Sequence, residues 1–295
     1  MSLHGESFLV GLIGSGIDAS LTPPMHEKAA DTHGIRYLYR PLNIDKLGPQ
    51  ELAFAPEDCG TLLKQGLALG YSAFNITHPC KQLIMDHLDE ISTDAQRLGA
   101  VNTVVLSQGK TVGYNTDYSG FATALTTGLA PTQDDLSSVL QLGTGGAGSA
   151  TAYALLSLGV ETLYLFDIAY DRAQERAQEL QKLFPQQTVL AASADNLPEL
   201  MQTVRGLVNA TPIGMHHHPG APIDLALLRP DLWVADVIYL PQETELITAA
   251  RALGARTLTG GHMAVGQAVD AFELITGIRP DATAMHQHFN QLTTN

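Results

Sequence analysis

The chain has few of the residues that mark secreted, membrane-spanning or nucleic-acid-binding proteins. It has only two cysteines, Cys59 and Cys80, in neither a C-x-x-C pair nor a disulfide framework, so we expect reduced thiols. Its 16 basic residues are outnumbered by 30 acidic ones, and the net charge of −14 opposes binding to phosphate backbones or anionic membranes. No apolar run approaches the ~20 residues that span a bilayer, and the first residues of the sequence lack the basic, then apolar, then small-residue order typical of a signal peptide. We therefore expect a soluble cytoplasmic protein, with neither nucleic acid nor membrane as partner.

The composition is that of a globular protein. With 295 residues, 45% of them hydrophobic, the chain can form one large domain or two ordinary ones, and a homodimer is left open. The run His216 to His218 precedes Pro219 and Gly220, and adjacent side chains on a loop rarely converge on one ion. We interpret this run as a solvated loop and predict no metal site.

Apolar runs typical of strands alternate with helical patterns in the first part of the chain. The strands are expected at Phe8–Ile13, Tyr37–Leu42 and Ala73–Ile76, the helices at Pro24–Thr32 and Glu57–Leu69, and a hairpin at Val101–Leu106 and Thr111–Tyr114. The glycine-rich stretch Gly11–Gly16 is followed by Pro23 and Pro24, which delay a helix, so we interpret it as a loop and not as a nucleotide site. This pattern predicts an α/β unit.

The second part of the chain shows the same alternation. Strands are expected at Val139–Leu142, Thr162–Phe166, Leu207–Val208, Trp233–Val237 and Arg256–Leu258, and helices at Ala150–Leu158, Arg172–Leu183 and Glu243–Leu253. This alternation of strands and helices predicts a doubly wound parallel sheet. The apolar positions of Met263–Thr276 and Asp281–Leu292 predict two further helices, which we expect to fold back on the first unit.

The most informative motif is a glycine-rich turn between a strand and a helix. Gly143, Gly145 and Gly148 form G-x-G-x-x-G, in which the glycines allow a tight turn, close approach of a pyrophosphate and close helix–strand packing. The helix N-terminus that follows attracts phosphate, so we include Gly146 and Ala147 among the cofactor-binding candidates. The alternative is an ordinary turn and helix cap.

Asp167 follows the next strand, 19 residues beyond Gly148, which is the usual interval for a carboxylate that binds a ribose hydroxyl. A carboxylate there repels a 2′-phosphate, so the motif favours NAD over NADP. Arg172 is the next basic residue and a further cofactor-binding candidate, whereas we interpret Asp171 as a helix N-cap. The alternative for Asp167 is a polar strand end.

Several polar residues lie near the ends of the expected strands of the first unit. Ser20 and Thr22 lie two apart in a segment expected to be extended, where both hydroxyls could face one anionic ligand. The other candidates are Thr77, Lys81, Asn102 and Asp117. Lysine and aspartate together form a plausible proton-transfer pair. Taken singly, these residues are equally typical of helix caps, turns and solvated surface positions.

Five stretches together resemble the shikimate dehydrogenase family, and the resemblance covers nearly the whole chain. They are Asn75-Ile-Thr-His-Pro-Cys-Lys81, Gly143-Thr-Gly-Gly-Ala-Gly148, Asn209-Ala-Thr-Pro-Ile-Gly-Met215, Asp236-Val-Ile-Tyr-Leu-Pro241 and Gly260-Gly-His-Met-Ala-Val-Gly-Gln267. The resemblance implies a discontinuous substrate domain, 1–116 with 262–295, and a Rossmann NAD-binding domain, 117–261. It also implies an oxidoreductase that transfers hydride from a ring alcohol to NAD.

The resemblance assigns roles to residues of both expected domains. Lys81 becomes the catalytic acid/base with Asp117 as its partner, and Ser20 and Thr22 bind the substrate carboxylate. The remaining substrate-binding candidates are Thr77, Asn102, Tyr239 and Gln267, and the remaining cofactor-binding candidates are Asn209, Ala210, Thr211, Val237, Gly261 and Met263.

Two departures from the common biosynthetic pattern point to one branch of the family. Thr22 replaces the second of two serines, and Asp167-Ile-Ala169 stands where a loop for the 2′-phosphate is usual. Both resemble the NAD-dependent quinate/shikimate dehydrogenases, which implies oxidation of shikimate and quinate to their 3-dehydro ketones in catabolism. The alternatives are a biosynthetic NADP-dependent shikimate dehydrogenase, an aminoshikimate-type dehydrogenase, and, in another class, an inactive NAD-binding regulatory protein.

Overall fold

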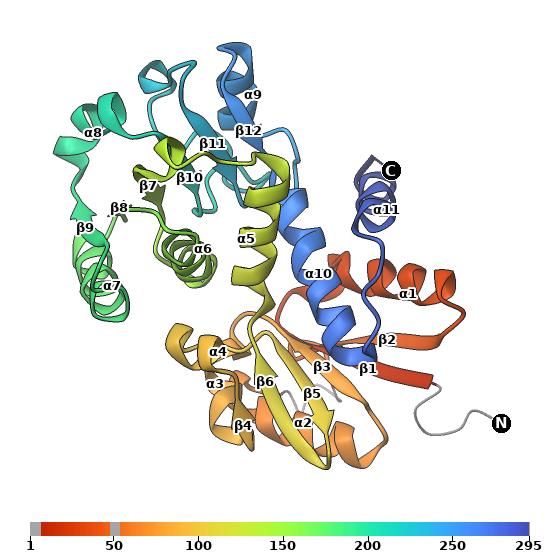
Figure 1. Ribbon diagram of the computed structural model, residues 1–295. Coiled ribbons are helices and arrows are strands. Elements are labelled where there is room, and N and C mark those ends of the chain that lie inside the picture. Colours follow the sequence, from red (N-terminus) through yellow and green to blue (C-terminus); the bar gives the residue numbers. More distant parts are fainter. Residues whose placement is uncertain (1–6, 48–53, 295) are drawn as a thin grey trace. The chain divides into compact units, whose positions relative to one another are not determined.

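A computed structural model describes residues 7–47 and 54–294 of the protein. The chain divides into two compact units, which Figure 1 colours along the sequence. Unit 1 contains the residues up to Thr116 together with those from Gln267 onward, and unit 2 contains Asp117–Gly266. The second division falls inside a continuous helix, α10 (Gly260–Thr276).

Unit 1 is built on a mixed six-stranded sheet. Its strands are β1 (Ser7–Gly14), β2 (Arg36–Asn43), β3 (Ala73–Ile76), β4 (Glu90–Ile91), β5 (Thr103–Ser107) and β6 (Lys110–Tyr114), in the spatial order β2-β1-β3-β5-β6-β4. The expected hairpin is β5–β6, and its turn residues Gln108 and Gly109 both have positive φ, as two-residue hairpin turns require.

Helices cover both faces of the unit 1 sheet because its buried strands carry apolar side chains on both faces. They are α1 (Thr22–Thr32), α2 (Cys59–Ala68), α3 (Cys80–Leu83), α4 (Thr93–Leu98) and α11 (Ala282–Thr294), joined by the C-terminal part of α10. Ile13 packs with α2 and α3 on one face, whereas Val10 packs with α1 and Phe272 of α10 on the other. Figure 1 shows α1 and α10 on one side of this sheet and α2 on the other.

Unit 2 is a parallel six-stranded sheet. Its strands are β7 (Ser138–Leu142), β8 (Thr162–Phe166), β9 (Thr188–Ala192), β10 (Gly206–Asn209), β11 (Trp233–Asp236) and β12 (Arg256–Leu258), in the order β12-β11-β10-β7-β8-β9. All five strand pairs are parallel. The direction of winding reverses between β7 and β10, and in such sheets ligands bind beyond the carboxyl ends of the strands at this point.

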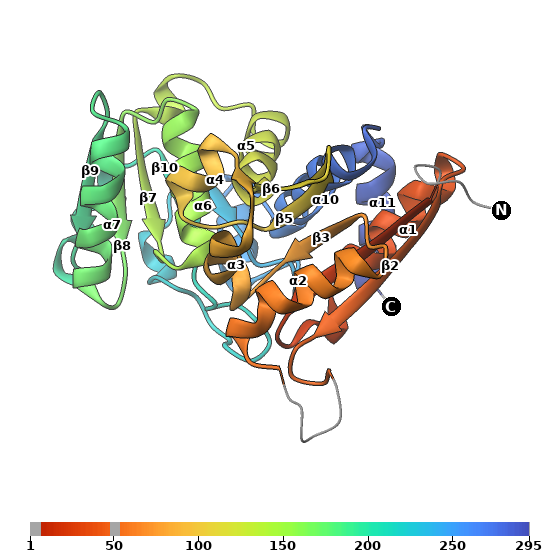
Figure 2. The ribbon, with the colours of Figure 1, turned by 90° about the horizontal axis from the view of Figure 1, so that it is seen from below.

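The helices of unit 2 lie on both faces of its sheet. They are α5 (Thr116–Gly128), α6 (Gly146–Ser157), α7 (Tyr170–Leu183), α8 (Leu197–Thr203) and α9 (Glu245–Ala252). One apolar core joins α8 and α9 to the sheet, and Figures 1 and 2 show α6 and α7 together along the strands β7 to β9. The predicted α/β class with a doubly wound parallel sheet is confirmed.

Two local expectations differ from the structure, and one helix was not expected. Asp171 is not an N-cap, because α7 begins one residue earlier, at Tyr170, with Ala169 as its cap; the carboxylate lies in the first turn, where it complements the helix dipole. The stretch Gly11–Gly16 is largely strand, since β1 continues to Gly14. The sequence patterns also gave no sign of α5, although it connects the two units in the chain.

Candidate active site

The glycine turn after β7 has the geometry that a dinucleotide needs. Gly143 has φ of 93°, and a Cβ on Gly148 would lie 2.2 Å from the carbonyl oxygen of Gly143, so neither position accepts a side chain. At Gly145 and Gly146, by contrast, an added Cβ would meet no atom within 4 Å. A phosphate can therefore approach this backbone at the N-terminus of α6, where the first N–H groups have no acceptor within the helix.

Gln141 fixes the shape of this turn. Its buried side-chain Nε2 donates to the carbonyl oxygens of Gly143 and Gly148, at 2.9 and 2.8 Å, and its Oε1 accepts from the hydroxyl of Thr151 at 2.8 Å. The glycine motif gave no indication of Gln141, because this residue precedes the motif and lies within the otherwise apolar end of β7. A glutamine buried on a central strand is the signal that could have identified it.

Replacing Gln141 by leucine is expected to weaken binding of a dinucleotide such as NAD about three- to tenfold, because two carbonyls of the turn lose their donor. Calorimetric titration with NAD measures this directly. Thr151→Val is the matched control, since it removes the Thr151 hydroxyl from Gln141 and leaves both donors to the turn in place. Equal NAD affinities of the folded Gln141→Leu protein and the wild type would contradict this role.

Asp167 lies at the end of β8, beside the glycine turn. Its Oδ2 accepts from the backbone N–H and the hydroxyl of Thr144, at 3.1 and 2.9 Å, and its Oδ1 pairs with Arg172 Nη2 at 2.5 Å. Burial alone would raise the pKa of Asp167, but Arg172 and the other donors outweigh it and lower this pKa. The carboxylate is therefore charged, and the partly exposed guanidinium of Arg172 lies beside it.

The ends of β10 and β11 form a second part of the site. Asn209 is fully buried, and its amide donates to the carbonyl of Ile213 and to Asp236 Oδ1, both at 3.1 Å, while its Oδ1 accepts from Thr211. Burial raises the pKa of Asp236, which also accepts from Thr244. The side chain of Asn209 thus holds the loop after β10 in place.

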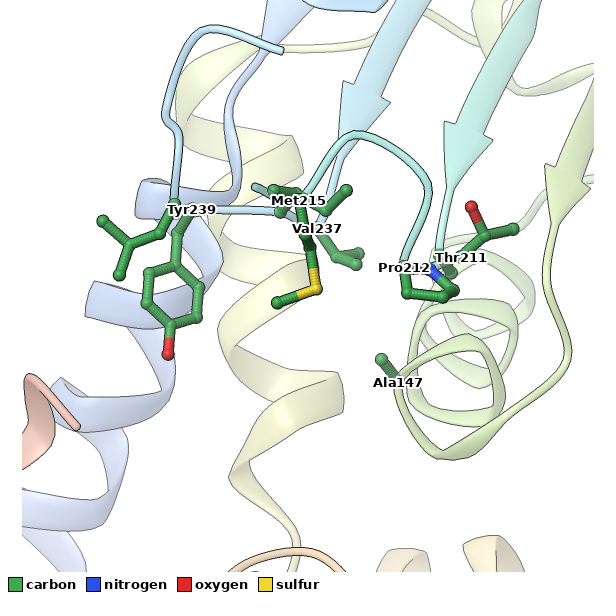
Figure 3. Close-up of a pocket in the computed structure, with 9 residues that line it drawn as sticks. Ala147, Thr211, Pro212, Met215, Val237 and Tyr239 are labelled. Carbon is green, nitrogen blue, oxygen red and sulfur yellow. The ribbon is translucent and has the colours of Figure 1, made fainter. Parts of the chain in front are cut away.

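This loop and the segment after β11 enclose a pocket of about 270 Å³. It is lined by Ala147, Ala210, Thr211, Pro212, Met215, Val237, Ile238, Tyr239 and Leu240. Figure 3 shows the side chains of Met215 and Tyr239 extending side by side beyond the strand ends, with Ala147 of α6 facing the same space. Predicted site residues from three separate motifs line this pocket. Pro212, Met215, Ile238 and Leu240 line it as well, and the sequence had given no role to them.

In unit 1, backbone hydrogen bonds bring three substrate-binding candidates to neighbouring strand ends. Thr77 follows β3, and its carbonyl accepts from the N–H of Cys80 at 2.8 Å, one residue before Lys81. The carbonyl of Lys81 in turn accepts from the N–H of Val101 at 2.8 Å. The segments that carry Thr77, Lys81 and Asn102 are therefore held together.

Asn102 is 4% exposed and connects this edge to the start of α5. Its Oδ1 accepts from the backbone N–H of Thr116 at 2.7 Å, and its Nδ2 donates to Thr116 Oγ1 at 3.0 Å. Asp117 follows directly in the chain. The side chain of Asn102 therefore caps the helix that carries Asp117.

Ser20 and Thr22 do not lie in one extended segment, contrary to the sequence-based expectation. Ser20 is extended, with φ of −63° and ψ of 131°, whereas Leu21 is helical and Thr22 is the first residue of α1. The helix starts this early because proline fits its first turn, where no N–H is needed. Both hydroxyls are half-buried at the N-terminus of α1, and the N–H of Thr22 lies 3.4 Å from Ser20 Oγ.

The remaining candidates lie on α10. Gly261 and Met263 are buried in its first turns within unit 2, and Gln267 is half-buried at the start of the part that belongs to unit 1. A Cβ on Gly260 would lie 2.4 Å from the carbonyl oxygens of Val237 and Ile238, so α10 begins in close contact with the segment that lines the pocket.

Two further observations concern the described parts of the chain. His216, His217 and His218 are exposed, and residues 7–47 and 54–294 contain no cluster of three or more His, Cys, Asp or Glu side chains placed to hold a metal ion. Within the same residues, no helix is both long and apolar enough to cross a membrane.

Comparison with known proteins agrees with this geometry. Residues 12–104 match the model of the shikimate dehydrogenase substrate-binding domain. The chain is 53% identical over 292 residues to a protein of Pseudarthrobacter chlorophenolicus named shikimate dehydrogenase (NADP(+)), covering 99% of this chain and 97% of that protein. The chain belongs to the shikimate dehydrogenase family. The resemblance stated from the sequence motifs is thereby confirmed.

Other members of the shikimate dehydrogenase family differ in their coenzyme. A protein of Corynebacterium glutamicum named quinate/shikimate dehydrogenase (NAD(+)) is 46% identical, covering 97% of this chain and 99% of that protein. The crystal structure of quinate dehydrogenase from the same organism in complex with NAD superposes with a TM-score of 0.90 at 44% identity, over 97% of this chain and 99% of that one. Family membership therefore leaves the choice between NAD and NADP to the residues of the site.

Proposed function

We propose that the protein oxidises shikimate and quinate to their 3-dehydro ketones with NAD as coenzyme. The observation that carries this proposal is the charged carboxylate of Asp167, held at the end of β8 beside the glycine turn by Thr144 and Arg172. It accepts hydrogen bonds from ribose hydroxyls and repels a 2′-phosphate. The similarity to the NAD-named quinate/shikimate dehydrogenase supports the same choice.

The residues fit a dinucleotide in two further respects. The open space over Gly145 and Gly146 admits a pyrophosphate, and the pocket beyond β10 and β11 adjoins the start of α6 through Ala147. Arg172, Asn209, Ala210, Thr211, Val237, Gly261 and Met263 complete the proposed cofactor-binding residues. When bound, the nicotinamide accepts the hydride from the alcohol carbon.

The proposed proton transfer belongs to Lys81, with Asp117 as its partner. In oxidation the amine of Lys81 accepts the proton of the ring hydroxyl, and in reduction its ammonium stabilises the alkoxide and returns the proton. Thr77, Asn102, Tyr239 and Gln267 are proposed to hold the ring, and Ser20 and Thr22 the carboxylate. Tyr239 is 36% exposed, and the partial desolvation of its hydroxyl raises its pKa.

A second candidate function is an NADP-dependent shikimate dehydrogenase. The exposed side of Arg172 offers a cation that a 2′-phosphate could use, and relatives that are 53% identical carry the NADP name.

Initial rates of NADH and NADPH formation with shikimate and with quinate, at alkaline pH, decide between the two. NADH formation with both acids supports the proposal. Formation of NADPH alone, and only with shikimate, supports the second candidate and contradicts the role given to Asp167. Binding of NAD without turnover of either acid would instead indicate a regulatory protein.

Replacing both Ser20 and Thr22 by alanine is expected to raise the KM for shikimate at least about tenfold, because two hydroxyl donors to a carboxylate are lost. The KM for NAD should not change. Thr32→Ala, at the other end of α1, is the control, since it removes an exposed hydroxyl from the same helix. Unaltered saturation by shikimate would exclude both residues from the site.

A further inference from the structure

A buried chain of hydrogen bonds runs across the sheet of unit 1 and ends at Asn102. It begins at Tyr39 on β2, whose hydroxyl lies 2.5 Å from Asn75 Oδ1 on β3, on the far side of β1. Asn75 Nδ2 donates to Thr103 Oγ1 at 2.9 Å and to the carbonyl of Asn102 at 3.3 Å. Thr103 Oγ1 donates to Asn102 Oδ1 at 3.1 Å. These four side chains are at most 6% exposed.

The direction of each hydrogen bond in this chain is determined. The carbonyl oxygen of Asn102 only accepts, so the side-chain nitrogen of Asn75 must face it, and the oxygen of Asn75 must face Tyr39. Tyr39 is therefore the donor. Burial raises the pKa of the Tyr39 hydroxyl well above its ordinary value, so this proton is retained.

The same logic fixes the amide of Asn102. Its Oδ1 accepts from Thr103 and from the backbone N–H of Thr116, so its nitrogen points away from both. One N–H of this nitrogen donates to Thr116 Oγ1, and the planar amide geometry then fixes the direction of its second N–H. Rotation of the amide by half a turn would bring its nitrogen against the backbone N–H of Thr116, which can only donate, at a cost typical of buried unsatisfied polar groups.

We propose that Tyr39 is a positioning residue for substrate binding: its hydroxyl orients Asn75, and through Thr103 it fixes the amide of Asn102 that binds a ring hydroxyl. This inference rests on the proposed function, because it needs Asn102 to bind the ring. It adds a residue on a strand that contributes no side chain to the proposed site. Because the cores of proteins are closely packed, loss of one hydroxyl on β2 is expected to alter the position of Asn102 at the start of β5, three strands along the sheet.

Tyr37 provides a matched control for Tyr39. It lies two residues earlier on β2, packs in the same apolar cluster and is similarly buried, at 8% against 6% exposed. Its hydroxyl bonds to His26 Nδ1 at 2.9 Å and has no hydrogen bond to Asn75. Tyr37→Phe and Tyr39→Phe thus each remove one buried hydroxyl, and only the second removes a donor to Asn75.

The test is the steady-state kinetics of the two variants with shikimate, quinate and NAD. Tyr39→Phe is expected to raise the KM for both acids about three- to tenfold relative to Tyr37→Phe. The KM for NAD should be the same in both, and thermal melting should show similar stabilities. Equal KM values for the acids in the two variants would overturn the inference while leaving the proposed function intact.

A second measurement tests whether Thr103 transmits the effect. Thr103→Val removes the hydroxyl that links Asn75 to Asn102 at nearly constant volume. If the chain acts as a unit, the double variant Tyr39→Phe/Thr103→Val loses less kcat/KM than the product of the two single losses. Independent, multiplicative losses would show that Tyr39 acts by another route. A wild-type protein that turns over neither acid would overturn the proposed function and this inference together.

Discussion

Replacing Lys81 by alanine is expected to lower kcat with shikimate by roughly 10²-fold or more, because the amine proposed to accept the hydroxyl proton is lost. Binding of NAD should be unchanged, since the proposed cofactor-binding residues all belong to unit 2 and Lys81 belongs to unit 1. The measurement is steady-state turnover together with calorimetric titration of NAD. A parallel loss of NAD affinity would show that the variant is misfolded.

Lys64→Ala is the matched control for Lys81→Ala. Lys64 is exposed on α2, so its loss removes one positive charge from the same unit without affecting the strand ends. Its kcat should equal that of the wild type. If Lys81→Ala also keeps the wild-type kcat, Lys81 is not the proton-transfer group.

Replacing Asp167 by serine is expected to shift the ratio of kcat/KM for NADP to that for NAD upward by at least about tenfold, which corresponds to ~1.4 kcal/mol. The variant removes the charge that repels a 2′-phosphate and releases Arg172 from its ion pair. Because the donors around Asp167 keep its pKa below the ordinary value, the wild-type preference should not change with pH in neutral and alkaline assays.

Asp171→Ser is the control for the coenzyme prediction. Asp171 is exposed in the first turn of α7, one residue before Arg172 in the chain, so the change removes the same charge close to Arg172. It should leave the coenzyme ratio nearly constant. A ratio that responds equally to both variants would mean that general charge, and not the position of Asp167, selects the coenzyme.

Secondary structure was most predictable from sequence where local patterns decide it. Ala73–Ile76 and Thr162–Phe166 are strands with the predicted bounds, because each is a mostly apolar run followed by turn residues. Arg256–Leu258 also has the predicted bounds. The start of α1 was less predictable, since the pair Pro23-Pro24 interrupts a helix in most contexts but is accommodated in a first turn. Helix α5 has small and polar residues without a clear apolar stripe. Its N-terminus is capped by the side chain of Asn102, which lies 14 residues earlier in the sequence.

The candidate site residues that belong to a sequence motif could be predicted. The residues that hold them in place through hydrogen bonds could not. The glycines and Asp167 follow from spacing alone, whereas Gln141 is visible only once the turn is folded around its amide. In the same way, the sequence around Tyr39 is that of an ordinary strand. Its hydrogen bond to Asn75 depends on the order of the strands in the sheet. Partners of this kind are set by tertiary structure, which a single sequence does not display.

The discontinuity of unit 1 has a consequence for how the chain is made. Val10 and Tyr37 emerge early in synthesis, but the core they enter also contains Phe272, whose ring stacks on Tyr37 with centroids 5.6 Å apart. Unit 2, residues 117–266, is one uninterrupted segment and can bury its own core first. During translation, the apolar side chains of β1 and β2 therefore remain without Phe272 until α10 has been synthesised, and apolar surface exposed in this way is prone to aggregation.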